Sequence, residues 1–114
     1  MKRGDIILVE LPQADTSGHE QEGLRPALVV HEEASSDQLS VIMIVPMTSN
    51  LRAQSFSHTI LVQPSAQNGL SMPSVLLVFQ LRAIDKRRIR KTLGTLETAI
   101  MEQVNAEMKK LLGI

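Results

Sequence analysis

Cysteine, tryptophan and tyrosine are all absent from this chain of 114 residues. Without cysteine, neither a disulfide framework nor a thiolate metal site is available, which fits a reducing compartment. Phe56 and Phe79 are the only aromatic residues, which argues against a single-strand nucleic-acid binder built on stacking platforms. No apolar run approaches the roughly 20 residues that a membrane helix requires. The first expected strand begins at Asp5 and leaves no room for a signal peptide, so we expect a soluble, cytoplasmic protein.

An excess of charge of either sign is also missing, because twelve basic and twelve acidic residues give a formal net charge of zero. No global basic field therefore draws nucleic acid to the surface. The charges are nevertheless uneven, since half of the basic residues crowd into one short segment: Arg82, Lys86, Arg87, Arg88, Arg90 and Lys91. We expect this basic segment to be either a solvated surface or a local contact to phosphate groups.

Motifs for metals and nucleotide cofactors are missing as well. The three histidines, His19, His31 and His58, are far apart, and none has the short spacing to another ligand that zinc sites show. The chain has no glycine-rich phosphate loop and no Gly-x-Ser-x-Gly motif for acyl transfer. We therefore expect neither a metal site nor a cofactor.

Short apolar runs separated by turn residues are what the chain does contain, and they predict a mainly β single domain spanning residues 1–114. The expected strands are Asp5–Glu10, Pro26–Val30, Leu39–Val45, His58–Val62, Ser74–Gln80 with a continuation through Leu81–Ile84, and Ile89–Leu93. Pro46 is expected to stop the third strand, residues 13–24 and 52–57 to form loops, the second of them mobile, and residues 67–69 to form a turn. Five to seven short strands indicate a small barrel or a strongly curved antiparallel sheet.

The last part of the chain predicts one α-helix. Thr95 is the expected N-cap, Glu97 falls in the first turn, and Gly113 is expected to end the helix. One apolar stripe at helical spacing should pack on the sheet: Ile100, Met101, Val104, Met108, Leu111 and Leu112.

A polar loop that enters the second strand is the strongest candidate for chemistry. It carries His19 and Glu20 and leads into Arg25, which Pro26 holds in an extended backbone conformation. Thr48 and Ser49 form a second polar group at the end of the third strand. Loops held by rigid strands commonly carry binding and catalytic residues, so we expect a site centred on an arginine that faces a threonine–serine pair.

Four motifs of this chain resemble those of one known family. They occur in the same order as in the family and extend along nearly the whole chain. They are Arg3-Gly4-Asp5-Ile6, Gly18-His19-Glu20-Gln21-x-Gly23-x-Arg25-Pro26, Val45-Pro46-Met47-Thr48-Ser49 and Gln80-x-Arg82-x-Ile84-Asp85. Together they closely resemble the MazF/PemK/Kid family of toxin endoribonucleases from toxin–antitoxin modules. The resemblance implies a homodimeric, SH3-like β-barrel with a C-terminal helix that cuts single-stranded mRNA at short sequences. It also implies a cognate antitoxin, which we expect to be an acidic, partly disordered peptide that occupies the RNA groove.

The resemblance assigns roles to individual residues. Arg25 and Thr48 match the catalytic positions, where a guanidinium and a hydroxyl stabilise the charge that builds on a phosphate. His19 is a candidate proton shuttle, and Glu20 is a candidate base or a group that orients Arg25. Three further residues are expected to support the site or bind RNA: Ser49, Gln80 and Arg82.

Alternative interpretations of these residues remain open at this point. Arg25 is otherwise a structural arginine paired with Glu20 or Glu22, and Thr48 is otherwise a turn residue. His19 is otherwise a loop residue that tunes RNA contacts, and Gln80 otherwise satisfies sheet backbone. For the basic segment, the two interpretations are a solvated surface and a contact to RNA or to the antitoxin.

The chain also departs from the family pattern just before Gln80. Relatives carry an arginine–aspartate pair or an acidic residue there, whereas this chain has Leu77, Val78 and Phe79. Phe79 either stacks on a base or belongs to the core. The alternative functions are a non-catalytic, protein-binding toxin of the same barrel class, similar to a gyrase poison, and a catalytically weakened homologue that acts as a regulator.

Overall fold

Seven antiparallel strands and one C-terminal helix make up the part of the chain that the structure, a computed structural model, describes: residues 1–11, 23–32 and 38–114. The strands are β1 Asp5–Leu11, β2 Gly23–Val29, β3 Val41–Thr48, β4 Thr59–Val62, β5 Ser74–Leu77, β6 Arg82–Asp85 and β7 Ile89–Thr95. Three short 3₁₀ helices, η1 Leu51–Ser55, η2 Val78–Gln80 and η3 Lys86–Arg88, lie between them, and the α-helix α2 covers Thr98–Leu112. The prediction of a mainly β fold with a C-terminal helix is confirmed.

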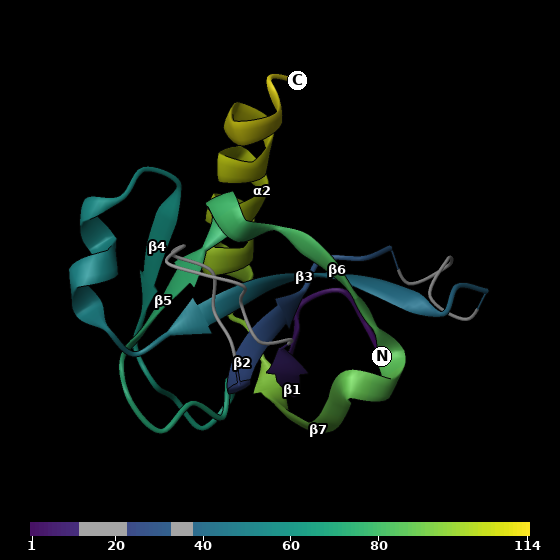
Figure 1. The fold of residues 1–114 in the computed structure, drawn as a ribbon. Helices are drawn as coiled ribbons and strands as arrows, with labels where there is room; N and C mark the ends of the chain where they lie inside the picture. The colour runs from purple at the N-terminus through teal and green to yellow at the C-terminus, as the bar shows by residue number, and fades with distance from the viewer. Residues whose placement is uncertain (12–22, 33–37) are drawn as a thin grey trace.

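Strand β3 lies at the centre of the curved sheet, and α2 projects from one side of it (Figure 1). The strand order is β4-β5-β3-β2-β1-β7, and β6 pairs with the first half of β3. Among the described strands, β4 and β7 form the two ends of this order, so the fold is barrel-like but not closed.

Both faces of the sheet are covered, which explains why the strands are continuous apolar runs rather than alternating patterns. Successive residues of a strand point to opposite faces, and Ile6 and Ile7 accordingly enter two different core clusters. The first cluster lies under α2 and includes Leu28, Met47 and Val104. The second fills the opposite face with residues from four strands: Ile7, Val9, Leu11, Ala27, Val29, Ile42, Ile44 and Ile84. We call this second surface the site face, because the candidate residues lie at its edges.

The prediction that Pro46 stops the third strand is wrong, because β3 runs through it to Thr48. Pairing with β6 ends at Ile44, and pairing with β5 begins only at Met47. Pro46 lies between these two pairings, beside the point where η2 interrupts the neighbouring strand. Proline has no backbone N–H to donate. On this side of β3 neither β5 nor β6 is paired with residue 46, so the sheet loses no hydrogen bond there.

Several other boundaries also differ from the prediction. The second strand begins at Gly23 rather than Pro26, so the last two residues of the expected loop 13–24 belong to it. The fifth strand ends at Leu77 rather than Gln80, because Val78–Gln80 form η2. The expected mobile loop 52–57 is largely the 3₁₀ helix η1, which Asn50 caps by accepting a hydrogen bond from the Arg52 N–H at 3.2 Å. The third strand begins at Val41, two residues after Leu39.

The N-terminal end of the α-helix is also corrected. Thr95 is the last residue of β7 rather than the N-cap, which is Glu97. Gly113 ends the helix with a left-handed φ of 71°, as predicted. The apolar stripe packs on the first cluster with one exception, Leu112, which is 56% exposed.

Candidate active site

Arg25 lies in β2 directly opposite Val9 of β1, at the exposed end of the strand pair. Its Nη1 donates a hydrogen bond to the carbonyl oxygen of Leu24 at 3.2 Å. Within the described residues it forms no ion pair with a carboxylate. The predicted alternative partners, Glu20 and Glu22, lie outside the described residues. Among the described residues, the bond to Leu24 uses one of the five N–H donors of the guanidinium.

Thr48 is the last residue of β3 and is paired with Val75 of β5. Its side chain is largely buried, with 9% of the residue exposed. Its Oγ1 accepts a hydrogen bond from the Asn50 N–H at 3.1 Å, so the residue has the turn function that the alternative interpretation expected. A hydroxyl that accepts one bond still has its own hydrogen to donate, so this turn function leaves a donor for a phosphate oxygen.

The register of β2 on β3 brings these two residues to the same edge of the sheet. The pairing of β2 with β3 ends where Ala27 meets Pro46, and Arg25 and Thr48 lie two residues further along their own strands. Side chains alternate between the two faces along a strand, so Arg25 shares the site face with Ala27, and Thr48 shares it with Ile44. A guanidinium and a hydroxyl at one strand edge are donors suited to a phosphate oxygen.

Gln80 and Arg82 lie together at a different part of this surface. Arg82 is half-buried opposite Ile44 of β3, and Gln80 is the last residue of η2. Both line a cavity of about 450 Å³. Phe79 lines it as well, and its ring meets Phe56 edge to face with the centroids 5.6 Å apart. Phe79 is thus anchored at the border of the core.

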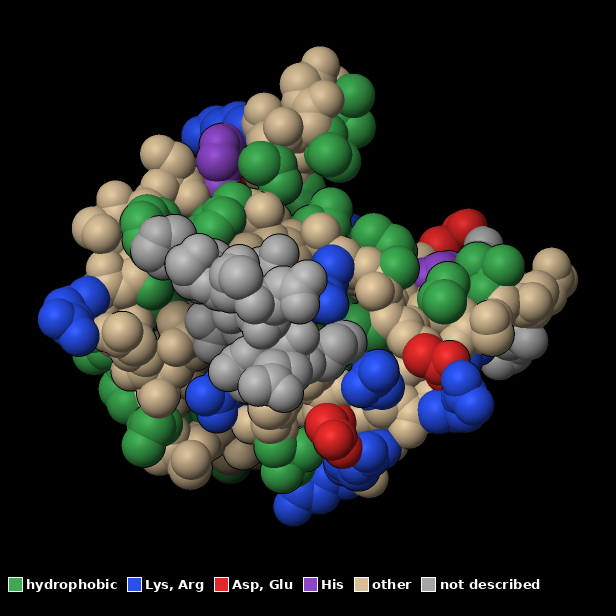
Figure 2. Space-filling model, viewed as in Figure 1, with side chains coloured by type: hydrophobic (Ala, Val, Ile, Leu, Met, Phe, Trp, Pro, Cys, Tyr) green, Lys and Arg blue, Asp and Glu red, His purple; other side chains and the backbone are tan. Residues whose placement is uncertain are grey.

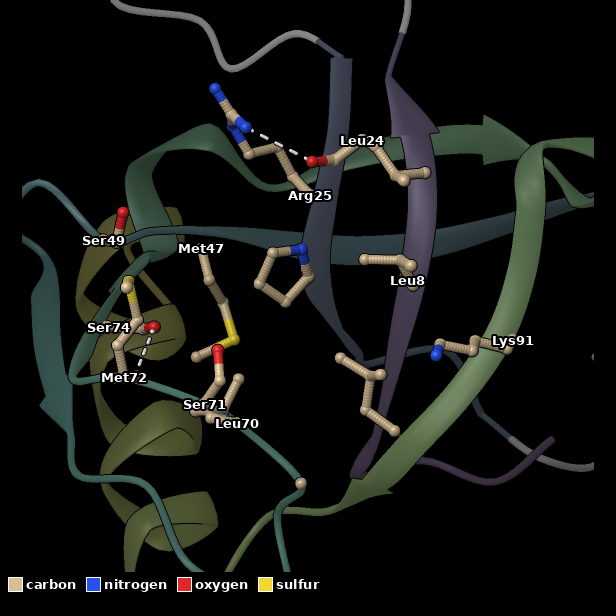
Figure 3. A pocket seen from close by; sticks show the side chains of 13 residues that line it. Leu8, Leu24, Arg25, Met47, Ser49, Leu70, Ser71, Met72, Ser74 and Lys91 are labelled. Carbon is tan, nitrogen blue, oxygen red and sulfur yellow. Dashed lines mark hydrogen bonds between the residues drawn. The ribbon is translucent and has the colours of Figure 1, made fainter.

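Ser49 shares a second cavity, of about 330 Å³, with Arg25 (Figure 3). Figure 3 shows the Arg25 guanidinium on its rim, turned back toward the Leu24 carbonyl. Sequence reasoning missed several other lining residues, including Leu70, Ser71 and Met72, and it named Lys91 in the basic segment without predicting its position here. Only the pairing of Leu8 with Lys91 places that lysine here, and no sequence motif reports such a register.

The histidines fall into two groups. His19, together with Glu20, lies outside the described residues, and their roles stay predictions. His31 Nδ1 accepts a hydrogen bond from the Met43 N–H at 3.2 Å, and His58 Nδ1 lies 2.8 Å from the Glu107 carboxylate on α2. Among residues 1–11, 23–32 and 38–114, no group of three or more His, Cys, Asp or Glu side chains is placed to hold a metal ion.

Two cations of the basic segment are paired with acids. The Arg87 guanidinium hydrogen-bonds to Asp85, and this contact lowers the pKa of the Asp85 carboxyl to about 2. Arg90 pairs with Glu10 of β1. Figure 2 shows basic side chains interspersed with acidic ones over the region of η3 and β7. For these two arginines the interpretation as a solvated, paired surface is supported.

The curved antiparallel sheet, with its arginine and threonine at adjoining strand ends, defines a small barrel-like β protein that presents donors for an anion. The model of the PemK-like, MazF-like toxins of type II toxin–antitoxin systems matches residues 2–112. The chain belongs to this family. No helix in the described part of the chain is long and apolar enough to span a membrane.

Individual relatives agree with this assignment. Endoribonuclease MazF of Staphylococcus saprophyticus is 26% identical over 114 residues, which are 100% of this chain and 92% of the relative. The crystal structure of MazF (Form-I) from Deinococcus radiodurans is similar with a TM-score of 0.79 and 26% identity, covering 100% of this chain and 97% of that one. A mycobacterial endoribonuclease in complex with its cognate antitoxin has the same fold, with a TM-score of 0.77, 20% identity and coverage of 100% and 96%.

Proposed function

We propose that this protein is a metal-independent, sequence-specific endoribonuclease that cleaves single-stranded mRNA as the toxin of a toxin–antitoxin system. One observation supports the proposal: in a chain of the PemK-like, MazF-like family, Arg25 and Thr48 lie on the same face of the sheet, each two residues beyond the pairing of Ala27 with Pro46. The endoribonuclease name of the Staphylococcus relative supports the same activity.

RNA supplies its own nucleophile, which is why no metal-bound water is needed. The 2′-oxygen attacks the adjacent phosphorus and loses its proton to a base, while the bond from phosphorus to the 5′-oxygen breaks and that oxygen gains a proton. The products are a 2′,3′-cyclic phosphate and a 5′-hydroxyl. The protein must provide a proton acceptor, a proton donor and stabilisation of the phosphorane charge.

Arg25 is assigned to charge stabilisation rather than proton transfer. Its planar guanidinium matches two phosphate oxygens at once, and its pKa is too high for proton exchange near neutral pH. Thr48 donates its hydroxyl hydrogen to the same phosphate. Ser49, Gln80 and Arg82 bind flanking RNA, and the acid–base roles belong to His19 and Glu20.

Leu77 and Val78 enter no part of this chemistry, because both are buried in the core. The acidic group that relatives carry before the glutamine is replaced here by apolar packing. The reaction is therefore assigned to the arginine–threonine edge and to the loop residues His19 and Glu20.

The partners proposed with this activity are single-stranded mRNA, a cognate acidic antitoxin and a second copy of the chain, in the cytoplasm. The antitoxin is supported by the mycobacterial neighbour, which was solved with its own. Light scattering should show a dimer at micromolar concentration, and a monomer would remove the homodimer from the proposal.

The activity is tested by incubating the purified protein with a pool of single-stranded transcripts in excess EDTA. We expect cleavage at a short recurring sequence and none in a duplex of the same sequence. Cleavage that requires Mg²⁺ would contradict metal independence. If no transcript is cut while the protein captures a topoisomerase, the protein-binding alternative takes its place.

A further inference from the structure

Three hydrogen bonds meet at Asn50, two residues after Thr48. The Asn50 N–H donates to the Thr48 Oγ1 at 3.1 Å. The Asn50 Oδ1 accepts a hydrogen bond from the Arg52 N–H at 3.2 Å, and the Asn50 carbonyl oxygen accepts one from the Ala53 N–H at 3.1 Å. The backbone and the side chain of Asn50 therefore connect the end of β3 to the first residues of η1.

These bonds form two successive turns that share Asn50. In the first turn, the Thr48 hydroxyl accepts from the N–H two residues further along the chain. In the second, the Asn50 side chain does the same for Arg52 and thereby caps η1. The Asn50 backbone is extended, with φ −78° and ψ 99°, as is typical of an N-cap residue. The cap thus fixes the backbone whose N–H holds the Thr48 hydroxyl.

The core holds η1 in place on the adjacent strand. Ala53, which is 9% exposed, belongs to one core cluster with Val75 and Leu77 of β5. Val75 is also the residue with which Thr48 pairs. The segment 48–53 is therefore attached to β5 at both ends, and the N–H of Asn50 between them has a fixed position relative to Thr48.

A fixed N–H limits the conformations of the Thr48 side chain. Threonine is branched at Cβ, so its χ1 angle has few accessible rotamers, and only a rotamer that keeps Oγ1 on the Asn50 N–H retains this bond. The bond uses one lone pair of the hydroxyl and leaves its hydrogen to donate. A donor that is already held in position stabilises a transition state without a cost of reorganisation.

We propose that Asn50 is a positioning residue for Thr48: its side chain caps η1, and the backbone N–H fixed in this way holds the Thr48 hydroxyl ready to donate to a phosphate. The inference deepens the proposed function and rests on it for the role of Thr48 in cleavage. The competing interpretation is that the cap only stabilises η1. Gln54 supplies the comparison, because its Nε2 donates to the Leu51 carbonyl at 3.0 Å within η1, in a bond that involves neither Thr48 nor Asn50.

The first part of the test measures the Thr48 rotamer and needs no RNA. The three-bond NMR couplings of the Thr48 methyl carbon to the backbone nitrogen and carbonyl carbon report χ1. Asn50→Ala removes the cap, whereas Asn50→Ser keeps a side-chain oxygen that caps helices as well, and Gln54→Ala is the control within η1. We expect averaged couplings in Asn50→Ala and a single rotamer in the other proteins. A single rotamer in Asn50→Ala would overturn the inference.

The second part measures cleavage of single-stranded RNA by the same proteins. Asn50→Ala should lower kcat about fivefold or more with KM unchanged, because the hydroxyl is needed in the transition state. Asn50→Ser should restore most of the rate. In the Thr48→Val background, Asn50→Ala should cause no further loss, because its effect acts through the hydroxyl. Equal losses in Asn50→Ala and Gln54→Ala, or a full further loss in the Thr48→Val background, would assign Asn50 a merely structural role.

The two measurements separate this inference from the proposed function. Averaged Thr48 couplings in Asn50→Ala, together with no RNA cleavage by the unchanged protein, would refute the proposed function and leave the positioning of the hydroxyl supported. RNA cleavage by the unchanged protein, together with an unaltered kcat in Asn50→Ala, would refute only this inference.

Discussion

At the scale of single residues, Arg25 differs from the other arginines whose partners are described, because its only described hydrogen bond goes to a neighbouring carbonyl. Arg87 and Arg90 are held by carboxylates, and Arg3 by Asn105 at 2.7 Å. Within the described residues, no ion pair has to be broken before Arg25 binds a phosphate. The sequence predicted Arg25 as a site residue. Which partners its guanidinium has depends on the fold.

Substitution of Arg25 should therefore remove charge stabilisation from the transition state. We expect Arg25→Ala to lower the single-turnover cleavage rate on the order of a hundredfold, as for the loss of a preorganised donor. Arg3→Ala is the control, because Arg3 precedes the other end of β1. Equal rates for the two variants would remove Arg25 from the site.

Thr48 gives a sharper test, because its hydroxyl has both a turn function and a proposed catalytic one. Thr48→Val keeps the shape but removes the hydroxyl, and should reduce the cleavage rate about tenfold or more. Thr48→Ser retains the hydroxyl and should restore most of the rate with the same melting temperature. If Val and Ser variants cleave equally well, Thr48 is only a turn residue.

The Glu97 carboxylate is expected to make the stability of the folded protein depend on pH. The Ser65 hydroxyl donates to Glu97 at 2.6 Å, and this bond lowers the pKa of the carboxyl below its usual value. A group with a lowered folded-state pKa adds stability above its unfolded-state pKa and loses it as the pH falls through the folded-state pKa. Glu97→Gln should therefore lower the melting temperature above about pH 5, where the unfolded carboxyl is ionised, and the difference should shrink in acid. Glu102→Gln on α2 is the control, and a difference that stays constant with pH would contradict the linkage.

At the scale of elements, the apolar runs predicted most strands because both faces of the sheet are buried and each run is short. What they could not predict depends on neighbours in space. Pro46 continues β3 where η2 interrupts the adjacent strand. Thr95 belongs to β7 rather than to the helix cap, because it pairs with Asp5 of β1, and its N–H donates to the Gln67 carbonyl at 2.9 Å. The position of Lys91 in the cavity follows from a register that contains two irregularities along β1 and β7.

Substitution of Gly69 tests how closely its backbone packs against Leu93 of β7. Gly69 and Gly113 share a φ of 71°, but a Cβ at Gly69 would meet the backbone of Leu93, whereas nothing lies within 4 Å at Gly113. Gly113→Ala should cost about 1 kcal/mol, the strain of a left-handed residue. Gly69→Ala adds the overlap and should cost about 3 kcal/mol or more. Chemical denaturation measures the free energy of unfolding of both variants. Equal losses would show that the Leu93 backbone moves easily to make room for the Cβ.

At the scale of the whole molecule, Arg25 lies where the site face adjoins the cavity on the other side of the sheet. The site face carries Arg25, Thr48 and Arg82, which we propose to bind RNA, and the opposite face forms the aliphatic cavity that Lys91 lines. The sequence predicted the first group through its resemblance to a family. It could not predict the second, because residues from β1, β2, β3, β7 and the segment 69–74 meet only after folding.

The chemical nature of the RNA ends tests the central claim most directly. After cleavage in excess EDTA, mass spectrometry of the fragments should find 2′,3′-cyclic phosphates and 5′-hydroxyls, the products of attack by the 2′-oxygen. Fragments with 5′-phosphates and 3′-hydroxyls would contradict the account, because those ends come from an attacking water that a metal usually activates.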